Sequence, residues 1–535
     1  MNMNKFFLCL ALLLAGCGGG MRYNAVKNQT PATDNPSDVQ ESFLYSTSLY
    51  GSDDGGPSAH IAVLLPTSGM AKTHGNNIKT SVETAFLRKP KTNMKISFFD
   101  LSGTVEERYE IMNQALSGDP DVIIGPLFAE DARILRDIKP SDLPVISFTS
   151  DANSLGDGVM TVNLIPTQSI ETIVRQMQID NIQNLVILAP NDSTGQLMTS
   201  VADASANIYN IPIKGVYYYE PGNSDSIKDV AMRSSLYKVR NAASIRAREV
   251  LSDILTNENV SGTVRGDLST QLEKISRTET LGEIPFDAIL FLGNAEDSKT
   301  MASFLRYYGI SNRDVAFYGT TLWHDPITAS DFTLSGAKYA TLPEMSKEFT
   351  ELYTKSSGKT PDHLAAFGFD ATNLVLGMIY SPLSEPDYLF NPNGYIGTNG
   401  AFRIQPNGES ERTLRIMGLN GSGTPTEIKP APTNFLTTLY NIDQNNTGYV
   451  YEQEILDYKI DPGDYITIPE ELKQIQKYKT KPIKINSLVE PVQHEQKPAQ
   501  IYVTENKETI SDPDFEPVKK EKVSRKYIDS VEITE

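Results

Sequence analysis

Short apolar runs alternate with segments of helical length in the first half of the chain. Three such runs are residues 61–65, 122–124 and 144–148, and each ends in a turn rich in Pro, Gly, Ser or Thr. Buried strands of a parallel sheet are continuous apolar runs separated by helical crossovers. The pattern therefore predicts a parallel α/β unit in which residues 77–89 and 105–118 form helices.

A second unit with the same alternation follows residue 166. Its predicted helices are residues 168–180, 194–209 and 298–308, and its predicted strands are residues 185–188, 216–219, 286–292 and 315–318. A polar, Arg-rich segment with apolar positions at helical spacing, residues 224–284, interrupts the alternation. This second unit is therefore a parallel α/β unit with a helical insertion.

The segments after the second unit lead the chain back between the two units. Residues 348–356 and 364–378 have helical patterns, and the glycines and alternation of residues 394–404 are typical of a hairpin. Segments that lead the chain back in this way predict two lobes joined by several crossings of the chain. We assign residues 58–165 and 340–395 to the first lobe, and residues 166–339 and 396–420 to the second lobe.

Polar turns follow the predicted strands. In parallel sheets ligands bind at the carboxyl ends of the strands, and the cleft between two lobes is the default binding site. The candidate cleft-lining residues are Thr67, Ser68, Gly69, Gly125, Pro126, Leu127, Thr149, Ser150, Asn191, Asp192, Thr320 and Trp323. An aromatic side chain near a strand end, such as that of Trp323, is more often part of the core.

The N-terminus has the features of an export signal. Lys5 precedes a short apolar run, residues 6–14, that is too short to span a membrane. The sequence Leu14-Ala15-Gly16-Cys17 resembles a bacterial lipobox, which implies removal of residues 1–16 and lipidation of Cys17. Gly18 after the lipidated residue implies an outer-membrane destination. The alternative is an ordinary signal peptide followed by a chance cysteine.

Residues 17–57 are rich in Gly, Asn, Ser, Asp and Pro and predict a flexible tether.

The 535-residue chain has a net charge of −19, which argues against nucleic acid and against an anionic membrane face as partners. Its two cysteines are Cys9, which lies in the signal, and Cys17. We therefore expect no disulfide, and an exported domain of this size needs none.

Catalytic motifs and zinc-ligand spacings are missing from the sequence. The five histidines are scattered without zinc-ligand spacing, and residues 357–360 lack the upstream glycine of a phosphate-binding loop. Ser235-Leu236-Tyr237-Lys238 matches the Ser-x-x-Lys pattern of penicillin-recognising enzymes, but the companion motifs are absent. We therefore expect no enzymatic activity and no required cofactor.

Several landmarks occur together and in order along the chain. They are residues 61–69, 124–128, 144–150, 188–191, 305–309, 318–323 and 397–403. With these landmarks the chain resembles the type I periplasmic-binding-protein fold over residues 58–420. More narrowly, it resembles the penicillin-binding protein activator lipoproteins, which are related to the branched-chain amino-acid binding proteins.

This resemblance implies a non-enzymatic lipoprotein that crosses the periplasm, docks on a class A penicillin-binding protein and stimulates peptidoglycan synthesis. The solute-binding relatives tend to place Ser or Thr after the Gly-Pro turn to hold a ligand carboxylate. This chain has Phe128 and Ala129 there, which argues against an amino-acid ligand. The alternative function is a solute-binding lipoprotein of an ABC transporter, with an amino acid or a muropeptide as ligand.

The C-terminal part has a different character. Residues 443–454 match the spacing of a calcium loop, with apolar flanks that predict an EF-hand-like helix–loop–helix over residues 430–462. The candidate ligands are Asp443, Asn445, Thr447, Tyr449 and Glu454. With two carboxylates we expect weak affinity, roughly 10⁻⁴–10⁻³ M; the alternative is a helix–turn–helix without metal. Residues 463–535 predict a mostly disordered tail.

Overall fold

The structure is a computed structural model. It describes residues 58–88, 94–258, 260–311, 313–323, 332–422, 424–435 and 449–485. The predicted signal peptide, the lipidation site at Cys17 and the tether lie outside the described residues, as do most of the predicted calcium loop and the last part of the tail. Within the described residues no helix is both long and apolar enough to span a bilayer.

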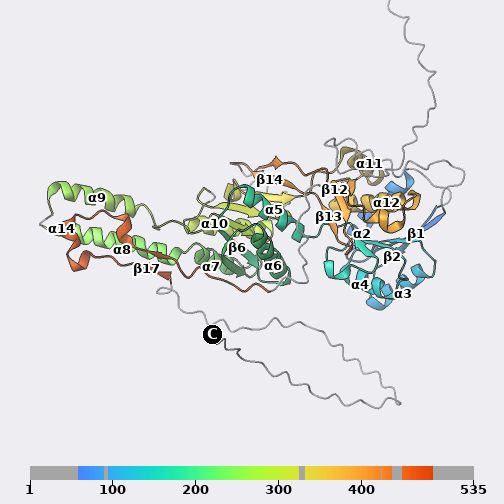
Figure 1. The fold of residues 1–535 in the computed structure, drawn as a ribbon, viewed down its shortest axis with the longest axis horizontal. Coiled ribbons are helices and arrows are strands. Elements are labelled where there is room, and N and C mark those ends of the chain that lie inside the picture. Colours follow the sequence, from blue (N-terminus) through green and yellow to red (C-terminus); the bar gives the residue numbers. More distant parts are fainter. Residues whose placement is uncertain are drawn as a thin grey trace, which may run out of the picture. The chain divides into compact units, whose positions relative to one another are not determined.

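The first lobe is built on a parallel five-stranded sheet with the strand order β2-β1-β3-β4-β5. Figure 1 labels β1 and β2 of this sheet. Its strands are β1 Ala59–Leu65, β2 Met94–Asp100, β3 Val122–Ile124, β4 Val145–Ser147 and β5 Val159–Thr161, and its helices are α2 Lys72–Leu87, α3 Val105–Leu116 and α4 Ala129–Ile138. The three predicted apolar runs form the buried strands β1, β3 and β4.

The second lobe contains a seven-stranded sheet with the order β15-β14-β10-β9-β8-β6-β7. Its strands are β6 Leu185–Pro190, β7 Ile213–Tyr219, β8 Ala288–Phe291, β9 Ala316–Gly319, β10 Lys338–Thr341, β14 Arg415–Leu419 and β15 Pro425–Lys429, and its helices include α5 Thr167–Ile179, α6 Ser193–Ile208 and α10 Ala295–Tyr307. Strands β14 and β15 are antiparallel to their neighbours, while the other pairings are parallel.

The chain passes between the two lobes three times. The crossings follow β5, β10 and the small three-stranded sheet β11 Tyr395–Gly397, β12 Gly400–Ile404 and β13 Ser410–Arg412. Between the second and third crossings, α11 Lys347–Ser357 and α12 His363–Tyr380 pack against α2, and the short α13 Glu385–Leu389 follows. The predicted two-lobed α/β fold with multiple crossovers is confirmed.

The predicted lobe boundary at residue 396 needs a correction. Residues 396–412 were assigned to the second lobe, but the β12–β13 turn contacts the first lobe, where Thr161 N donates to Gly408 O at 2.9 Å. Gly397 lies against the Asp370 carboxylate of α12. The hairpin packs there because its buried face completes the core beside α12, and the chain enters the second lobe only at β14.

The insertion between β7 and β8 forms three helices, α7 Ser224–Ser234, α8 Tyr237–Leu255 and α9 Gly262–Ser276. A C-terminal segment lies beside α8 (Figure 1), and it contains β16 Lys459–Ile460, η5 Pro462–Tyr465, α14 Glu470–Lys473, η6 Gln476–Tyr478 and β17 Ile483–Lys484. The prediction of a disordered tail is therefore wrong for residues 463–485. Ile466, Ile468 and Tyr478 are buried against α8 and α9, which orders this part.

The predicted helix after the calcium loop is also wrong. Residues 449–458 form no helix, and Gln453 pairs in a β-bridge with Val216 at the edge of β7. Glu454 lies 2.9 Å from Arg233 of α7, which also contacts Glu452 at 2.6 Å. These contacts hold the segment in an extended conformation. Asp443, Asn445 and Thr447 lie outside the described residues, and the calcium site stays a prediction.

Candidate functional site

The predicted cleft residues of the first lobe lie at one edge of the five-stranded sheet. Thr67 N and Ser68 N both donate to the Asp100 carboxylate, at 2.8 and 3.3 Å. Gly125 N donates to Ile146 O at 2.8 Å, next to Pro126 and Leu127. Gly125 has a φ of +105°, and a Cβ there would lie 2.1 Å from Leu64 O, so only glycine fits this approach. The structure thus brings these turns together, with Gly69 exposed beside them.

Polar groups in these turns are largely occupied within the lobe. The Thr149 hydroxyl is buried and accepts from Asp151 N at 3.1 Å, while Ser150 beside it is exposed. Phe128 follows the Gly-Pro turn with 47% of its surface exposed, and Met70 follows the β1 turn fully exposed. The strand ends of the first lobe therefore present the apolar side chains of Phe128 and Met70 beside the exposed Ser68 and Ser150.

The predicted residues of the second lobe are engaged in the same way. Asn191 Nδ2 donates to Glu220 Oε1 at 2.8 Å, and Asp192 caps α6 by accepting from Gly195 N at 2.7 Å. Thr320 is fully buried after β9. Strand β8 separates β6 from β9, so these two turns share a sheet edge without being adjacent.

Trp323 belongs to the core and does not line a cleft. Its side chain is 0% exposed, and its Nε1 donates to Ser298 Oγ at 3.0 Å. Its ring packs between those of Phe291 and Tyr339, at centroid distances of 5.7 and 6.2 Å. The expectation that Trp323 lines a cleft is corrected, because the ring packs directly over the backbone of Gly319.

Ser235 of the Ser-x-x-Lys sequence is fully buried at the end of α7. Its hydroxyl donates to Met232 O at 3.0 Å. A nucleophile must reach its substrate, so this serine is not placed for acyl transfer. Among the described residues no group of three or more His, Cys, Asp or Glu side chains is placed to hold a metal ion.

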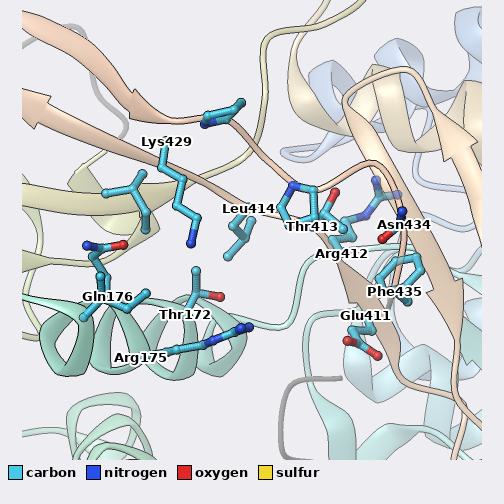
Figure 2. Close-up of a pocket in the computed structure, with 14 residues that line it drawn as sticks. Thr172, Arg175, Gln176, Glu411, Arg412, Thr413, Leu414, Lys429, Asn434 and Phe435 are labelled. Atoms are coloured by element: carbon cyan, nitrogen blue, oxygen red, sulfur yellow. The ribbon is translucent and has the colours of Figure 1, made fainter. Parts of the chain in front are cut away.

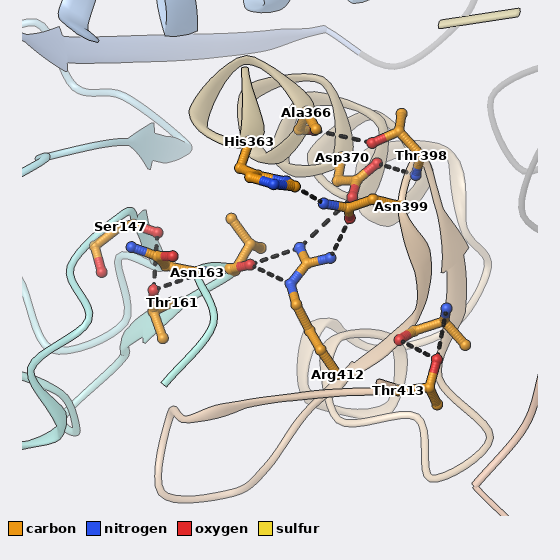
Figure 3. Close-up of polar contacts among 12 residues, drawn as sticks. Ser147, Thr161, Asn163, His363, Ala366, Asp370, Thr398, Asn399, Arg412 and Thr413 are labelled. Carbon is orange, nitrogen blue, oxygen red and sulfur yellow. Dashed lines mark hydrogen bonds and ion pairs between the residues drawn. The ribbon is translucent and has the colours of Figure 1, made fainter. Parts of the chain in front are cut away.

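A buried charge pair lies where the crossings meet (Figure 3). The Arg412 side chain is 0% exposed and donates through Nε and Nη2 to Val162 O, at 2.8 and 2.6 Å. Its Nη1 donates to Asn399 Oδ1 at 2.9 Å. The guanidinium carbon lies 4.3 and 4.8 Å from the ring centroids of Phe367 and Phe402. Arg412 thus joins the first crossing, α12 and the three-stranded sheet.

Asp370 of α12 is the acidic partner of Arg412, at 3.5 Å. Its Oδ1 accepts from Thr398 N at 2.8 Å, but its Oδ2 accepts no hydrogen bond from the described residues. Because burial is complete and the Arg412 contact is long, desolvation raises the pKa of Asp370 to about 6. Burial also lowers the pKa of Arg412 to about 10. No sequence pattern indicates this pair, although Asp370 is a carboxylate within an apolar helix.

The raised pKa of Asp370 predicts a pH dependence of stability. Between about pH 4 and 6 the folded state retains a proton on Asp370 that the unfolded state has lost. The contribution of this carboxyl group to the free energy of unfolding therefore falls as the pH rises. We subtract the unfolding free energy of Asp370→Asn from that of the parent protein. We expect this difference to decrease as the pH rises through this window and to level off above it. Urea unfolding at several pH values measures this difference, and a difference that rises with pH would contradict the assignment.

A pocket lies beside the third crossing (Figure 2), between α5, the β13–β14 segment and residues 429–435. Its lining residues are Thr172, Arg175, Gln176, Ile179, Glu411, Arg412, Thr413, Leu414, Ile416, Lys429, Pro430, Pro432, Asn434 and Phe435. Arg175 and Gln176 come from α5, and Lys429 ends β15. This pocket is separate from the strand-end turns of both lobes, and none of the predicted cleft residues lines it.

One parallel sheet and one mainly parallel sheet, joined by three crossings, are the features of the type I periplasmic-binding-protein fold. A solved structure described as a putative branched-chain amino acid ABC transporter from Rhodospirillum rubrum aligns with a TM-score of 0.51. That alignment covers 70% of this chain and 100% of the other, at 14% sequence identity, and so shows the fold alone. No family model matches the sequence.

The chain is similar in sequence to a penicillin-binding protein activator. The activator LpoA of Pasteurella multocida is 24% identical over 196 residues, which is 34% of this chain and 33% of that protein. The match thus spans about a third of the length of this curated relative. The C-domain of LpoA from Haemophilus influenzae, described as a regulator of PBP1A, aligns over 69% of this chain and 100% of that domain, with 16% identity and a TM-score of 0.47.

Proposed function

We propose that this protein is a periplasmic lipoprotein, anchored to the outer membrane through Cys17, that binds a class A penicillin-binding protein and stimulates peptidoglycan synthesis. The 196-residue similarity to a penicillin-binding protein activator carries this proposal. The type I periplasmic-binding-protein fold agrees with it. The protein itself performs no chemistry in this role, and its surface is the functional element.

The occupied strand ends support a binding scaffold over a working amino-acid pocket. Asp100, Thr149 and Asp192 already bond to groups of their own lobe. An amino-acid ligand would need free hydroxyl or amide groups to hold its carboxylate, because a few well-placed polar groups fix a ligand's orientation in its pocket. The exposed side chain of Phe128 supplies none.

The predicted tether gives the proposed anchor its reach. About 40 residues between Cys17 and the first lobe correspond to an average span of roughly 35 Å, and to about 130 Å when fully extended. A partner held in the opposite membrane would then be accessible to the folded lobes. The anchor and the tether act by raising the local concentration of the two proteins.

A glycan-strand synthesis assay tests the proposal. We expect the purified mature chain to raise the rate of a class A synthase from the same organism, because an activator shifts the enzyme toward its active state. Heat-unfolded chain and an unrelated solute-binding protein are the controls. No stimulation of any class A synthase by the folded chain would exclude this function.

A solute-binding lipoprotein of an ABC transporter, with an amino acid or a muropeptide as ligand, is the second candidate. The fold shared with a putative branched-chain amino acid transporter structure favours it. A thermal-shift screen with amino acids and muropeptides separates the two functions. The adaptor function predicts no specific stabilisation through the strand-end turns, whereas a transport function requires it.

A further inference from the structure

Two cations face the pocket beside the third crossing without an acidic partner (Figure 2). Arg175 projects from α5 and Lys429 from the end of β15. Neither side chain forms an ion pair or a hydrogen bond with any residue in the part of the chain that the structure describes. Arg175 is half-buried and Lys429 is exposed. In a protein with a net charge of −19, two unpaired cations at one pocket create a local site for negative charge.

Three carboxylates near this pocket are paired with other cations. Glu411, which also lines the pocket, lies 2.6 Å from Arg403. Glu427, two residues before Lys429 on β15, lies 3.4 Å from Arg415. Asp180, at the end of α5, lies 2.8 Å from Lys338. These three acids are therefore paired with other cations, and Arg175 and Lys429 form no ion pair with the described residues.

The rest of the pocket is largely apolar. Leu414 and Ile416 are buried at its base, and Pro432 and Phe435 line another side. Ligand pockets typically combine an apolar surface with a few polar groups that fix orientation. A guanidinium matches the planar oxygen pairs of carboxylates and phosphates, while an ammonium adds a point charge. The lining thus suits a ligand with an anionic head and an apolar body.

We propose that this pocket binds a small amphipathic anion, a carboxylate or a phosphate attached to an apolar group. Arg175 and Lys429 hold the anionic head, and the Leu414 side supports the apolar part. The pocket adjoins the β13–β14 crossing, which begins directly after the buried Arg412. A ligand bound in this pocket therefore stiffens the connection between the lobes. This site goes beyond the proposed adaptor function and does not depend on it.

Competition for a fluorescent anion tests the proposal. The folded mature chain is titrated with 1-anilinonaphthalene-8-sulfonate, and the bound dye is displaced with octanoate, octyl phosphate or 1-octanol. We expect both anions to displace the dye and the uncharged alcohol to fail. A stronger effect of octanoate assigns a carboxylate head, and a stronger effect of octyl phosphate assigns a phosphate head. Displacement by octanol as effective as by the anions would overturn the proposal.

Charge removal locates the site. In Arg175→Gln/Lys429→Gln we expect the affinity for the two anions to fall by about tenfold or more, because the charge-assisted contacts are lost. The matched control is Lys274→Gln/Arg313→Gln, which removes two exposed cations that form no ion pair with described residues. Equal affinities in parent and pocket variant, or an equal loss in the control, would refute the site. Each variant removes two positive charges, and melting curves test its folding independently of synthase stimulation.

Discussion

Replacing Arg412 with methionine is expected to destabilise the protein by about 3–5 kcal/mol. The substitution removes three hydrogen bonds, to Val162 O and Asn399 Oδ1, and leaves Asp370 buried without its cation. A single unpaired charge in the interior is costly because water no longer solvates it. Urea unfolding followed by circular dichroism measures the loss.

A second substitution separates charge from packing. In Arg412→Met/Asp370→Leu no buried charge remains, so we expect the double variant to recover part of the stability that the single variant loses. Arg277→Met is the control, because Arg277 forms an exposed pair with Glu273 and should change stability by less than about 0.5 kcal/mol. Additive losses in the double variant would show that Asp370 and Arg412 are not coupled.

Replacing Trp323 with alanine is expected to cost about 3–5 kcal/mol. The change removes the largest fully buried side chain and leaves a cavity beside Phe291 and Tyr339. It also leaves Ser298 without the indole N–H that donates to it. Because Trp323 is the single tryptophan, unfolding is followed by circular dichroism and not by intrinsic indole fluorescence.

The adjacent residue supplies the control for Trp323. Leu322 is 41% exposed, so Leu322→Ala should change stability by no more than about 0.5 kcal/mol. We expect Trp323→Phe to be intermediate, since it retains much of the ring volume and loses the hydrogen bond. Comparable stability of the alanine variant and the parent would contradict the buried position of Trp323.

The lobes were predictable because their strands carry a local signal. Residues 122–124 and 185–188 are continuously apolar, and burial on both faces of a parallel sheet requires this. Strand β2 was missed because polar side chains alternate along it at the sheet edge, where Lys95 is exposed. Sequence patterns therefore located the interior of each sheet better than its border.

The crossing site was not predictable because its contacts join distant parts of the chain. Arg412 contacts Val162, which lies 250 residues earlier in the sequence. It also contacts Asp370, which precedes the three-stranded sheet in the sequence. Neither the helical pattern around Asp370 nor the hairpin pattern before Arg412 contains that pairing. The helix expected after residue 454 failed for a similar reason, since Arg233 and the β7 edge fix the segment in an extended form.

The central claim is that the folded lobes bind a class A penicillin-binding protein. Sedimentation velocity of the mature chain mixed with the purified periplasmic part of the synthase measures this directly. We predict a complex that saturates as the synthase is titrated and persists with excess amino acids. Separate sedimentation of the two proteins at every ratio, with every class A synthase of the organism, would contradict the claim.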